Sequence, residues 1–439
     1  MSRLFIDTPY LVFENHETQN DGPLDARPGE IAVLRELASR YAEIAADPVN
    51  GERQRMWALL NDLKRTRPLI WINEICWNEM NTGDELTLRT ENLVCRRIET
   101  ELRRTIYQWN HMQGDMVVAP AFRAPFILEN SGFGITVEAD VLETEEDREI
   151  ASRRFHNQLL TEEDIDKIRD PVVVVNRKRT EEFLQFYRRI FEGILPVERR
   201  GCTGFWYAPW DEIVFWMGAG AVLEALLEKP DFMHKLIARV CQAFLRGLDQ
   251  FESLDLISRN DTNVRIGSGA YGYTGDLPRP EGPSSRVRCS ELWGSSTAQI
   301  FGSVSPALHQ EFGIEYERGW LDRFGLAYYG CCEPLHNKIE QLATIPNLRK
   351  ISTSPWANVP VVAELVQGRY VMSLKPSPSC LAAPGFDPEA VRNELLAKLT
   401  EARGCNVEVV LKDISTVRHE PQRLWLWTEV AMEVVRSLE

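Results

Sequence analysis

The feature that most constrains the fold is a repeated alternation of short apolar runs with amphipathic helical patterns. Strands that alternate with helices imply a parallel sheet with right-handed crossovers. A set of eight such strands favours closure into an α/β barrel of the (β/α)8 (TIM barrel) type. The alternative is an open doubly wound sheet, but no glycine-rich dinucleotide loop follows the first run. The eight runs are residues 68–75, 115–120, 196–202, 263–267, 325–330, 347–352, 370–374 and 406–412.

The chain before the first run has a different pattern. Apolar residues from Ile31 to Tyr41 recur at the three- and four-residue spacing of an amphipathic helix, and residues 53–64 continue in the same way. We therefore expect an N-terminal helical extension over residues 1–65, followed by a barrel over residues 66–439.

Composition excludes several kinds of partner. Acidic residues outnumber basic ones, 65 to 50, and give a formal charge of −15, which is the wrong sign for gripping nucleic acid. No apolar run approaches the ~20 residues of a membrane helix, and the N-terminus lacks a signal-peptide core. The nine scattered cysteines indicate reduced thiols. We expect a cytoplasmic protein that acts on a small molecule, without a membrane or nucleic-acid partner.

Polar residues follow several of the predicted strands, at the end of a barrel where active sites lie. Cysteine, histidine and glutamate are zinc ligands, and they cluster after the fifth run. In the alternative interpretation Cys331 packs in the core, Cys332 ends the strand and His336 starts a helix. Cys332, Glu333 and His336 are close enough in sequence to bind one ion, with Cys202, Cys380 or Glu74 as candidates for a further ligand from another strand. The predicted metal ligands are Cys331, Cys332, His336 and Cys380, and the predicted catalytic residues are Glu74, Glu333 and His336.

A second group of residues has the chemistry to hold a substrate. Arg265, Lys375 and Arg418 could bind a carboxylate, although Arg265 or Lys375 could equally neutralise Glu74. Aromatic side chains could line a pocket for a flat ligand, or belong to the core. The predicted substrate-binding residues are Trp77, Trp206, Tyr273, Trp293, Tyr329, Arg265 and Lys375.

One segment resembles a known family. The run from Glu291-Leu292-Trp293-Gly294 through Phe301 to Phe312 is similar to a strand-to-helix segment of the uroporphyrinogen decarboxylase superfamily. Tyr328-Tyr329-Gly330-Cys331 then follows where zinc-dependent methyltransferases of that superfamily carry His-x-Cys-Gly. Two departures stand out. The arginine-rich element of the decarboxylase is absent, which argues against decarboxylation of uroporphyrinogen, and Tyr329 replaces the histidine ligand.

The resemblance implies a methyltransferase that moves a methyl group from a small methoxylated or N-methylated donor to the corrinoid of a partner protein. It implies zinc as a cofactor and, by analogy with relatives, a homodimer. The first alternative is a decarboxylase or lyase that holds carboxylates with Arg265, Lys375 and Arg418 and moves protons with Asp413 or Glu291. The second is a barrel that binds a ligand without catalysis.

Overall fold

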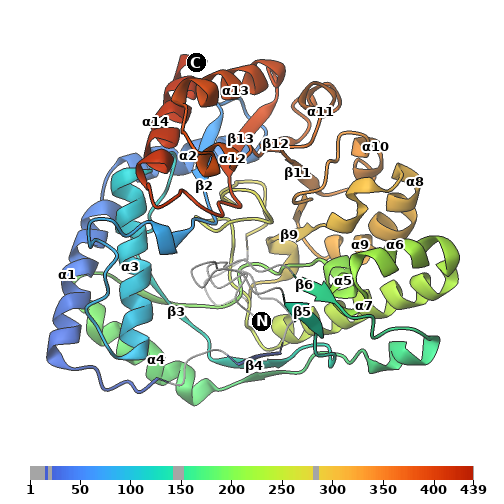
Figure 1. Ribbon diagram of the computed structural model, residues 1–439. Coiled ribbons are helices and arrows are strands. Elements are labelled where there is room, and N and C mark those ends of the chain that lie inside the picture. Colours follow the sequence, from blue (N-terminus) through green and yellow to red (C-terminus); the bar gives the residue numbers. More distant parts are fainter. Residues whose placement is uncertain (1–14, 18–21, 142–152, 280–285, 439) are drawn as a thin grey trace.

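The computed structural model describes residues 15–17, 22–141, 153–279 and 286–438. Its main sheet has six strands, all parallel (Figure 1). The predicted α/β class with a parallel sheet is therefore confirmed. In spatial order the strands are β2 (Leu69–Ile72), β13 (Asn406–Leu411), β12 (Val371–Leu374), β11 (Leu348–Thr353), β10 (Leu326–Tyr329) and β9 (Trp293–Ser296).

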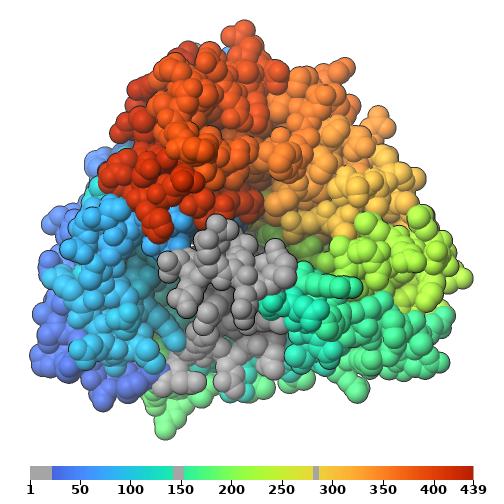
Figure 2. Space-filling view, in the orientation of Figure 1, coloured from blue at the N-terminus to red at the C-terminus, as the bar shows by residue number. Residues whose placement is uncertain are grey.

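Most residues of these strands are buried on both faces of the sheet. All residues of β9, β10, β12 and β13 are buried, as is usual for parallel strands covered by helices. Helices α11 (Val359–Val366), α13 (Pro388–Glu401) and α14 (Gln422–Ser437) form part of the outer layer, and α14 packs against β2. Figure 2 shows this C-terminal part, in orange and red, as one side of the molecule, facing the blue N-terminal helices and the green central ones.

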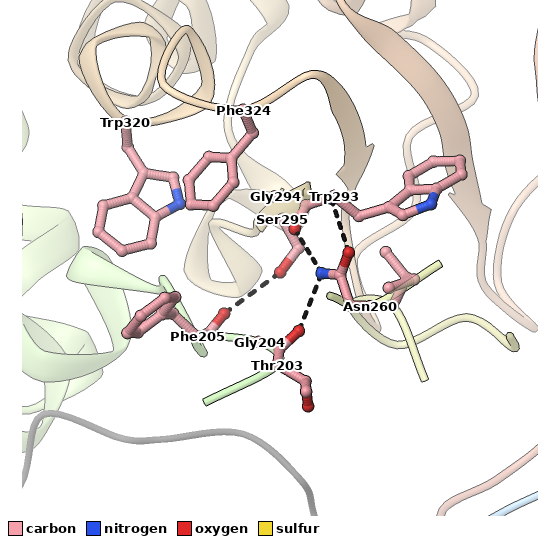
Figure 3. A pocket seen from close by; sticks show the side chains of 11 residues that line it. Thr203, Gly204, Phe205, Asn260, Trp293, Gly294, Ser295, Trp320 and Phe324 are labelled. Carbon is pink, nitrogen blue, oxygen red and sulfur yellow. Dashed lines mark hydrogen bonds between the residues drawn. The ribbon is translucent and has the colours of Figure 1, made fainter. Parts of the chain in front are cut away.

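A separate pair of parallel strands, β3 (Phe122–Pro125) and β8 (Val197–Arg200), lies beyond the main sheet, covered by α4 (Arg177–Phe191). After β8 the backbone continues into a parallel bridge between Cys202 and Ile257. Asn260 then joins this region to β9: its Nδ2 donates to Thr203 O at 2.8 Å and Trp293 O at 2.9 Å, and its Oδ1 accepts from Trp293 N at 3.0 Å (Figure 3). The described strands therefore do not close into one hydrogen-bonded barrel.

Two predicted strands are wrong. Residues 115–120 contain no strand, because the Asp115 carboxylate accepts from Ile70 N at 2.7 Å and so takes the edge of β2 itself. Residues 263–267 have only an isolated bridge between Arg265 and Tyr271. Conversely, β9 was not among the eight predicted runs, although the family-like segment covers it.

The glycine-rich loop of residues 267–273 fills the concave side of the sheet. A Cβ on Gly267 would lie 2.3 Å from Tyr328 Cδ1, and one on Gly269 would lie 2.5 Å from Glu408 Oε1. Only glycine allows so close an approach of the loop backbone to the strands. Ala270 N donates to Glu408 Oε1 at 3.1 Å. The interior of the fold is thus packed with backbone as well as side chains.

The N-terminal helices are α1 (Pro28–Ala45), α2 (Val49–Asn61) and α3 (Leu93–His111), and α1 packs along α3. Trp57 of α2 donates to Asp115 O at 2.9 Å, so α2 is tied to the sheet region. The division at residue 65 stays a prediction, and residues 1–14 and 18–21 lie outside the described part. No described helix is long and apolar enough to cross a membrane.

The remaining elements flank these layers. Strands β1, β4 and β7 form a small antiparallel sheet, and β5 pairs with β6. Their bounds, with those of the other α-helices, are β1 (Asn15–Glu17), β4 (Leu128–Ser131), β5 (Ala139–Val141), β6 (Arg153–Phe155), β7 (Val173–Val175), α5 (Pro209–Met217), α6 (Ala219–Glu228), α7 (Pro230–Ser253), α8 (Pro306–His309), α9 (Glu315–Leu321), α10 (Ile339–Leu342) and α12 (Ser379–Ala382).

Candidate active site

Two adjacent cysteines follow β10 and meet a lysine that follows β13. The Cys331 and Cys332 sulfurs are 3.5 Å apart, and Lys412 Nζ lies 3.7 Å from the first and 3.9 Å from the second. Cys331 is buried, whereas Cys332 is half-buried. Because parallel strands end at the same edge of the sheet, residues from β10 and β13 converge although 80 positions separate Cys332 from Lys412.

Two carboxylates complete this group, which we call the thiol–lysine cluster (Glu74, Cys331, Cys332, Lys412 and Asp413). Lys412 Nζ is 2.8 Å from Asp413 Oδ2 and 3.4 Å from Glu74 Oε2. Glu74 also pairs with Arg265 at 2.7 Å. Both acidic residues have left-handed backbones, with φ of 51° at Glu74 and 57° at Asp413. Strained backbone of this kind concentrates at functional sites.

The pKa values of the two cysteines in the cluster shift in opposite directions. The hydrogen bond with Cys331 and the charge of Lys412 lower the pKa of the Cys332 thiol against the effect of burial. The same hydrogen bond, together with burial, raises the pKa of Cys331. The nearby sulfurs and carboxylates raise the pKa of Lys412 although the side chain is buried. The arrangement therefore favours a Cys332 thiolate beside a protonated lysine, the form in which cysteine is nucleophilic.

The pKa values of the two carboxyl groups, Glu74 and Asp413, also shift in opposite directions. Arg265 and Lys412 lower the pKa of Glu74 well below its usual range, despite burial. Burial and the charge of Glu74 raise the pKa of Asp413, against Lys412. A pair of carboxyl groups whose pKa values are pushed apart separates a permanent anion from a potential acid. Asp413 has 54% of its side chain exposed, so it can reach a substrate.

Glu333 and Ser352 hold the cysteine backbone in place. Glu333 is buried and accepts from Cys331 N at 2.9 Å and from the Thr297 hydroxyl at 2.8 Å. The Ser352 hydroxyl donates to Cys331 O at 2.7 Å. Both carboxylate oxygens of Glu333 are thus used to orient the turn after β10. Glu333 contacts the cluster as a positioning residue, and its predicted catalytic role stays a prediction.

Lys375, which follows β12, lies deeper inside the fold. Its Nζ donates to the Tyr328 hydroxyl at 2.6 Å, to Ser373 Oγ at 2.8 Å and to Ser373 O at 3.0 Å. Burial lowers its pKa to about 7, because these acceptors are neutral and the groups that oppose the shift, Glu408 first and then the two cysteines, act only from a distance. Lys375 is 2% exposed. Its predicted contact with substrate stays a prediction.

Of the four predicted metal ligands, the structure brings Cys331 and Cys332 together, with their sulfurs 3.5 Å apart. Cys380 donates to Ser377 O at 3.7 Å, and the half-buried His336 keeps an Nδ1 without a hydrogen-bond partner among the described residues. Within the described ranges no group of three His, Cys, Asp or Glu side chains is placed to hold a metal ion. The Lys412 ammonium occupies the space between the two sulfurs and Asp413, where it would repel a cation. The donor set therefore does not fit zinc.

Most of the predicted aromatic residues lie in packed positions. Trp293 is buried and donates to Gly272 O at 2.8 Å, and Tyr329 is buried between His309 at 2.6 Å and Glu317 at 2.7 Å. The others lie elsewhere: Trp77 stacks under Arg104 on α3, Trp206 bonds Asp211, and Tyr273 is on the interior loop. Their predicted contact with a substrate stays a prediction.

A small cavity lies between β9 and the segment after β8, at the position bridged by Asn260 (Figure 3). Phe205, Trp293, Trp320 and Phe324 line it. Its volume is about 10 Å³, which is room for one water molecule. The cavity is too small for a substrate, and no residue of the thiol–lysine cluster lines it. We therefore place the candidate site at the cluster.

Sequence reasoning missed Lys412 and gave Asp413 only a secondary role. The signal was present, because Lys412-Asp413 directly follows the all-buried strand β13. Lysine is rarely buried unless it is paired, so a lysine at the end of such a strand deserved the same weight as the cysteines.

Fold and site together define an α/β protein with a parallel sheet that carries a charged thiol site at its carboxyl edge. No family model matches the chain, and no curated protein matches it. Among solved structures, the chain is similar to a methyltransferase from Methanosarcina mazei, with a TM-score of 0.46 and 9% sequence identity. That likeness covers 87% of this chain and 98% of the other. It is too distant to carry a functional argument.

Proposed function

We propose that the protein is a methyltransferase that uses Cys332 as its nucleophile. The carrying observation is the Lys412 ammonium, which lies within 4 Å of both cysteine sulfurs and next to the exposed acid Asp413. A stabilised thiolate beside a general acid is equipped for group transfer. The sequence resemblance to methyltransferases selects the methyl group as the one transferred.

In the first half-reaction the Cys332 sulfur attacks the methyl carbon of a small methoxylated or N-methylated donor. The sulfur–carbon bond forms as the bond to the donor's oxygen or nitrogen breaks. The electron pair stays on that heteroatom, which takes a proton from Asp413. In the second half-reaction the methyl group passes to the acceptor, and Lys412 stabilises the Cys332 thiolate as it leaves. The resemblance implies that the acceptor is the corrinoid of a partner protein.

The same proposal includes the fold. The side-chain bridge at Asn260 and the contact between Asp115 and β2 support a ring of strands of the (β/α)8 type with an irregular wall. In such a ring the cluster lies at the carboxyl ends of the strands, where barrel enzymes place their catalytic groups.

The proposal is tested with the purified protein, cob(I)alamin as the methyl acceptor and a panel of methoxylated and N-methylated donors. Cys332→Ala should abolish methyl transfer, and Asp413→Asn should lower the rate by about 100-fold, the scale of general acid catalysis. Donor alone should add one methyl group to Cys332, detected by mass spectrometry of the peptide.

Cys380→Ala is the matched control, because Cys380 is also half-buried but bonds Ser377 instead of the cluster. It should transfer methyl groups at the normal rate. Normal turnover by Cys332→Ala would contradict the nucleophile assignment, and loss of activity in Cys380→Ala would favour the metal site that the sequence predicts.

The decarboxylase alternative is not supported by the residues first assigned to it. Arg265 is already paired with Glu74, and Lys375 is bonded to neutral groups inside the fold. Arg418 lies on an exposed left-handed turn. Any carboxylate of the substrate would have to be held elsewhere.

A further inference from the structure

Two arginines come together on the short parallel strands β3 and β8. In the register of this pair, Pro125 lies opposite Arg200, and Arg123 lies opposite Glu198. Side chains alternate between the faces of a strand, so Arg123 and Arg200 share one face. The other face of β3 carries Phe122 and Ala124, which pack in the helix-covered core. The two arginines therefore point to the inner side.

The side chains converge on common neighbours. Arg123 Nη2 donates to Asn263 Oδ1 at 2.5 Å. Burial raises the pKa of Tyr273 to about 12, and the charges of Arg123 and Arg200 both act against that rise. Both guanidiniums are thus within electrostatic range of the same buried hydroxyl. Tyr273 belongs to the glycine-rich interior loop, which places the arginine pair beside the interior of the fold.

Within the described ranges no carboxylate forms an ion pair with either guanidinium, although Glu198 lies on the same face of the strand pair. Among the described residues, Arg200 forms no hydrogen bond or ion pair, and Glu101 and Glu198 act on it only from a distance. Burial and the Arg123 guanidinium lower the pKa of Arg200 to about 9. Two half-buried like charges without a bound counter-charge are unfavourable, and an anion placed between them would relieve that cost.

A short segment of chain links the arginine pair to the thiol–lysine cluster. Asn263, which contacts Arg123, is two residues from Arg265, which contacts Glu74. Two residues of chain span at most about 7 Å between Cα atoms. The segment 263–265 therefore connects the arginine pair with the cluster, and a substrate that reaches both sites would have to extend along this segment.

We propose that Arg123 and Arg200 form a binding site for an oxyanion, either carboxylate or phosphate, of the small-molecule substrate. Arginine suits this role because its planar fork donates two hydrogen bonds to such a group. As the recognition element of methyl transfer the site rests on the proposed function, whereas anion binding itself does not. The arginines anchor the donor and leave its methyl group to the cluster.

The test is direct titration calorimetry of the full chain with succinate and, separately, with inorganic phosphate. We expect one of the two anions to bind, and Arg123→Met and Arg200→Met each to weaken that binding at least tenfold. The matched control is Arg199→Met. Arg199 neighbours Arg200 but lies on the opposite face, where it pairs with Glu181, so its loss should change the affinity less than twofold.

The two anions distinguish the chemical source: tighter succinate binding indicates a carboxylate, and tighter phosphate binding indicates a phosphate. Binding of neither anion, or equal losses in Arg199→Met and Arg200→Met, would overturn the site. Should Arg200→Met fail to fold, Arg200→Lys, which keeps the charge but not the fork, should still weaken binding several-fold. Cys332→Ala should bind the anion normally, so failure of the nucleophile and failure of the anion site are separable.

Discussion

Lys375 and Lys412 follow neighbouring strands and are buried to nearly the same extent, at 2% and 4% exposure, yet their pKa values move in opposite directions. Lys412 is surrounded by anions or potential anions, and its pKa is raised. Lys375 donates to hydroxyls and a carbonyl, and its pKa falls to about 7. Burial penalises both charges, so the partners alone decide the outcome.

The opposite pKa shifts of Lys375 and Lys412 follow from the number of carboxylates that each lysine has nearby. Inside the fold Glu408 is bonded to Lys350 at 2.8 Å, with both side chains fully buried, and this leaves Lys375 to neutral groups. At the carboxyl edge of the sheet, which we call the rim, Lys412 has two carboxylates within 3.4 Å. Lys375, inside the fold, therefore loses its proton more readily than an ordinary lysine, whereas Lys412, at the rim, keeps its proton.

The largest effect is expected from removing the interior carboxylate. Glu408→Gln leaves Lys350 and Lys375 buried without an anion, so the free energy of unfolding should fall by about 3–5 kcal/mol. Urea denaturation measures the change. Glu74→Gln is the control at the rim, where Asp413 remains, and it should cost clearly less. Equal losses would show that the two lysines depend on their carboxylates alike.

A second change removes the rim lysine. Lys412→Met takes away the positive charge beside Cys332, so the pKa of that thiol should rise and its alkylation by iodoacetamide at pH 7 should slow by about tenfold. Mass spectrometry of the Cys332 peptide follows the reaction. Lys375→Met should slow it far less, because Lys375 makes no hydrogen bond to either sulfur among the described contacts. Equal alkylation rates in Lys412→Met and Lys375→Met would show that Lys412 has no special effect on the Cys332 thiol.

The smallest effect is a pH dependence. The pKa of Lys375 is about 7 in the folded protein, below its ordinary value of 10.5, so between these values the unfolded chain binds the extra proton. The free energy of unfolding should therefore rise with pH in this window, by about 1 kcal/mol from pH 7.5 to 8.5. Urea denaturation of the wild type and Lys375→Met isolates the contribution. A variant with the same slope as the wild type would contradict the low pKa.

The sequence predicted what depends on continuous apolar runs. Strands β2, β10, β12 and β13 lie within predicted runs and β11 extends one residue beyond its run, because strands buried on both faces are rich in hydrophobic residues. It failed where a single side chain or glycine replaces a strand: Asp115 occupies the edge of β2, and Gly267 begins a loop. Strand β9 contains Gly294 and two serines, so packing rather than propensity makes it a strand.

The site was predicted in part. The structure brings Glu74, Cys331 and Cys332 together, as expected of polar residues at the ends of parallel strands, and their predicted roles stay predictions. Lys412 was not predicted, because a cluster of zinc-ligand residue types gives no indication of a lysine between them. Arg200 was not among the predicted site residues, since it directly follows another arginine, Arg199, in the sequence. Only the register of β3 against β8 separates the two residues, placing Arg199 outside and Arg200 inside.

The backbone of the interior loop solvates the buried charges of the sheet in place of water. Water would ordinarily surround charges such as Glu408 and Lys350, but here the backbone amide of Ala270 and the carbonyl of Tyr271 take its place at 3.1 Å each. Unlike water, these dipoles cannot turn when a charge changes. A new ionisable residue on the inner face of β11, β12 or β13 would therefore meet backbone dipoles that are oriented for Glu408 and Lys350. A change of charge on these strands would require a matching change in the loop.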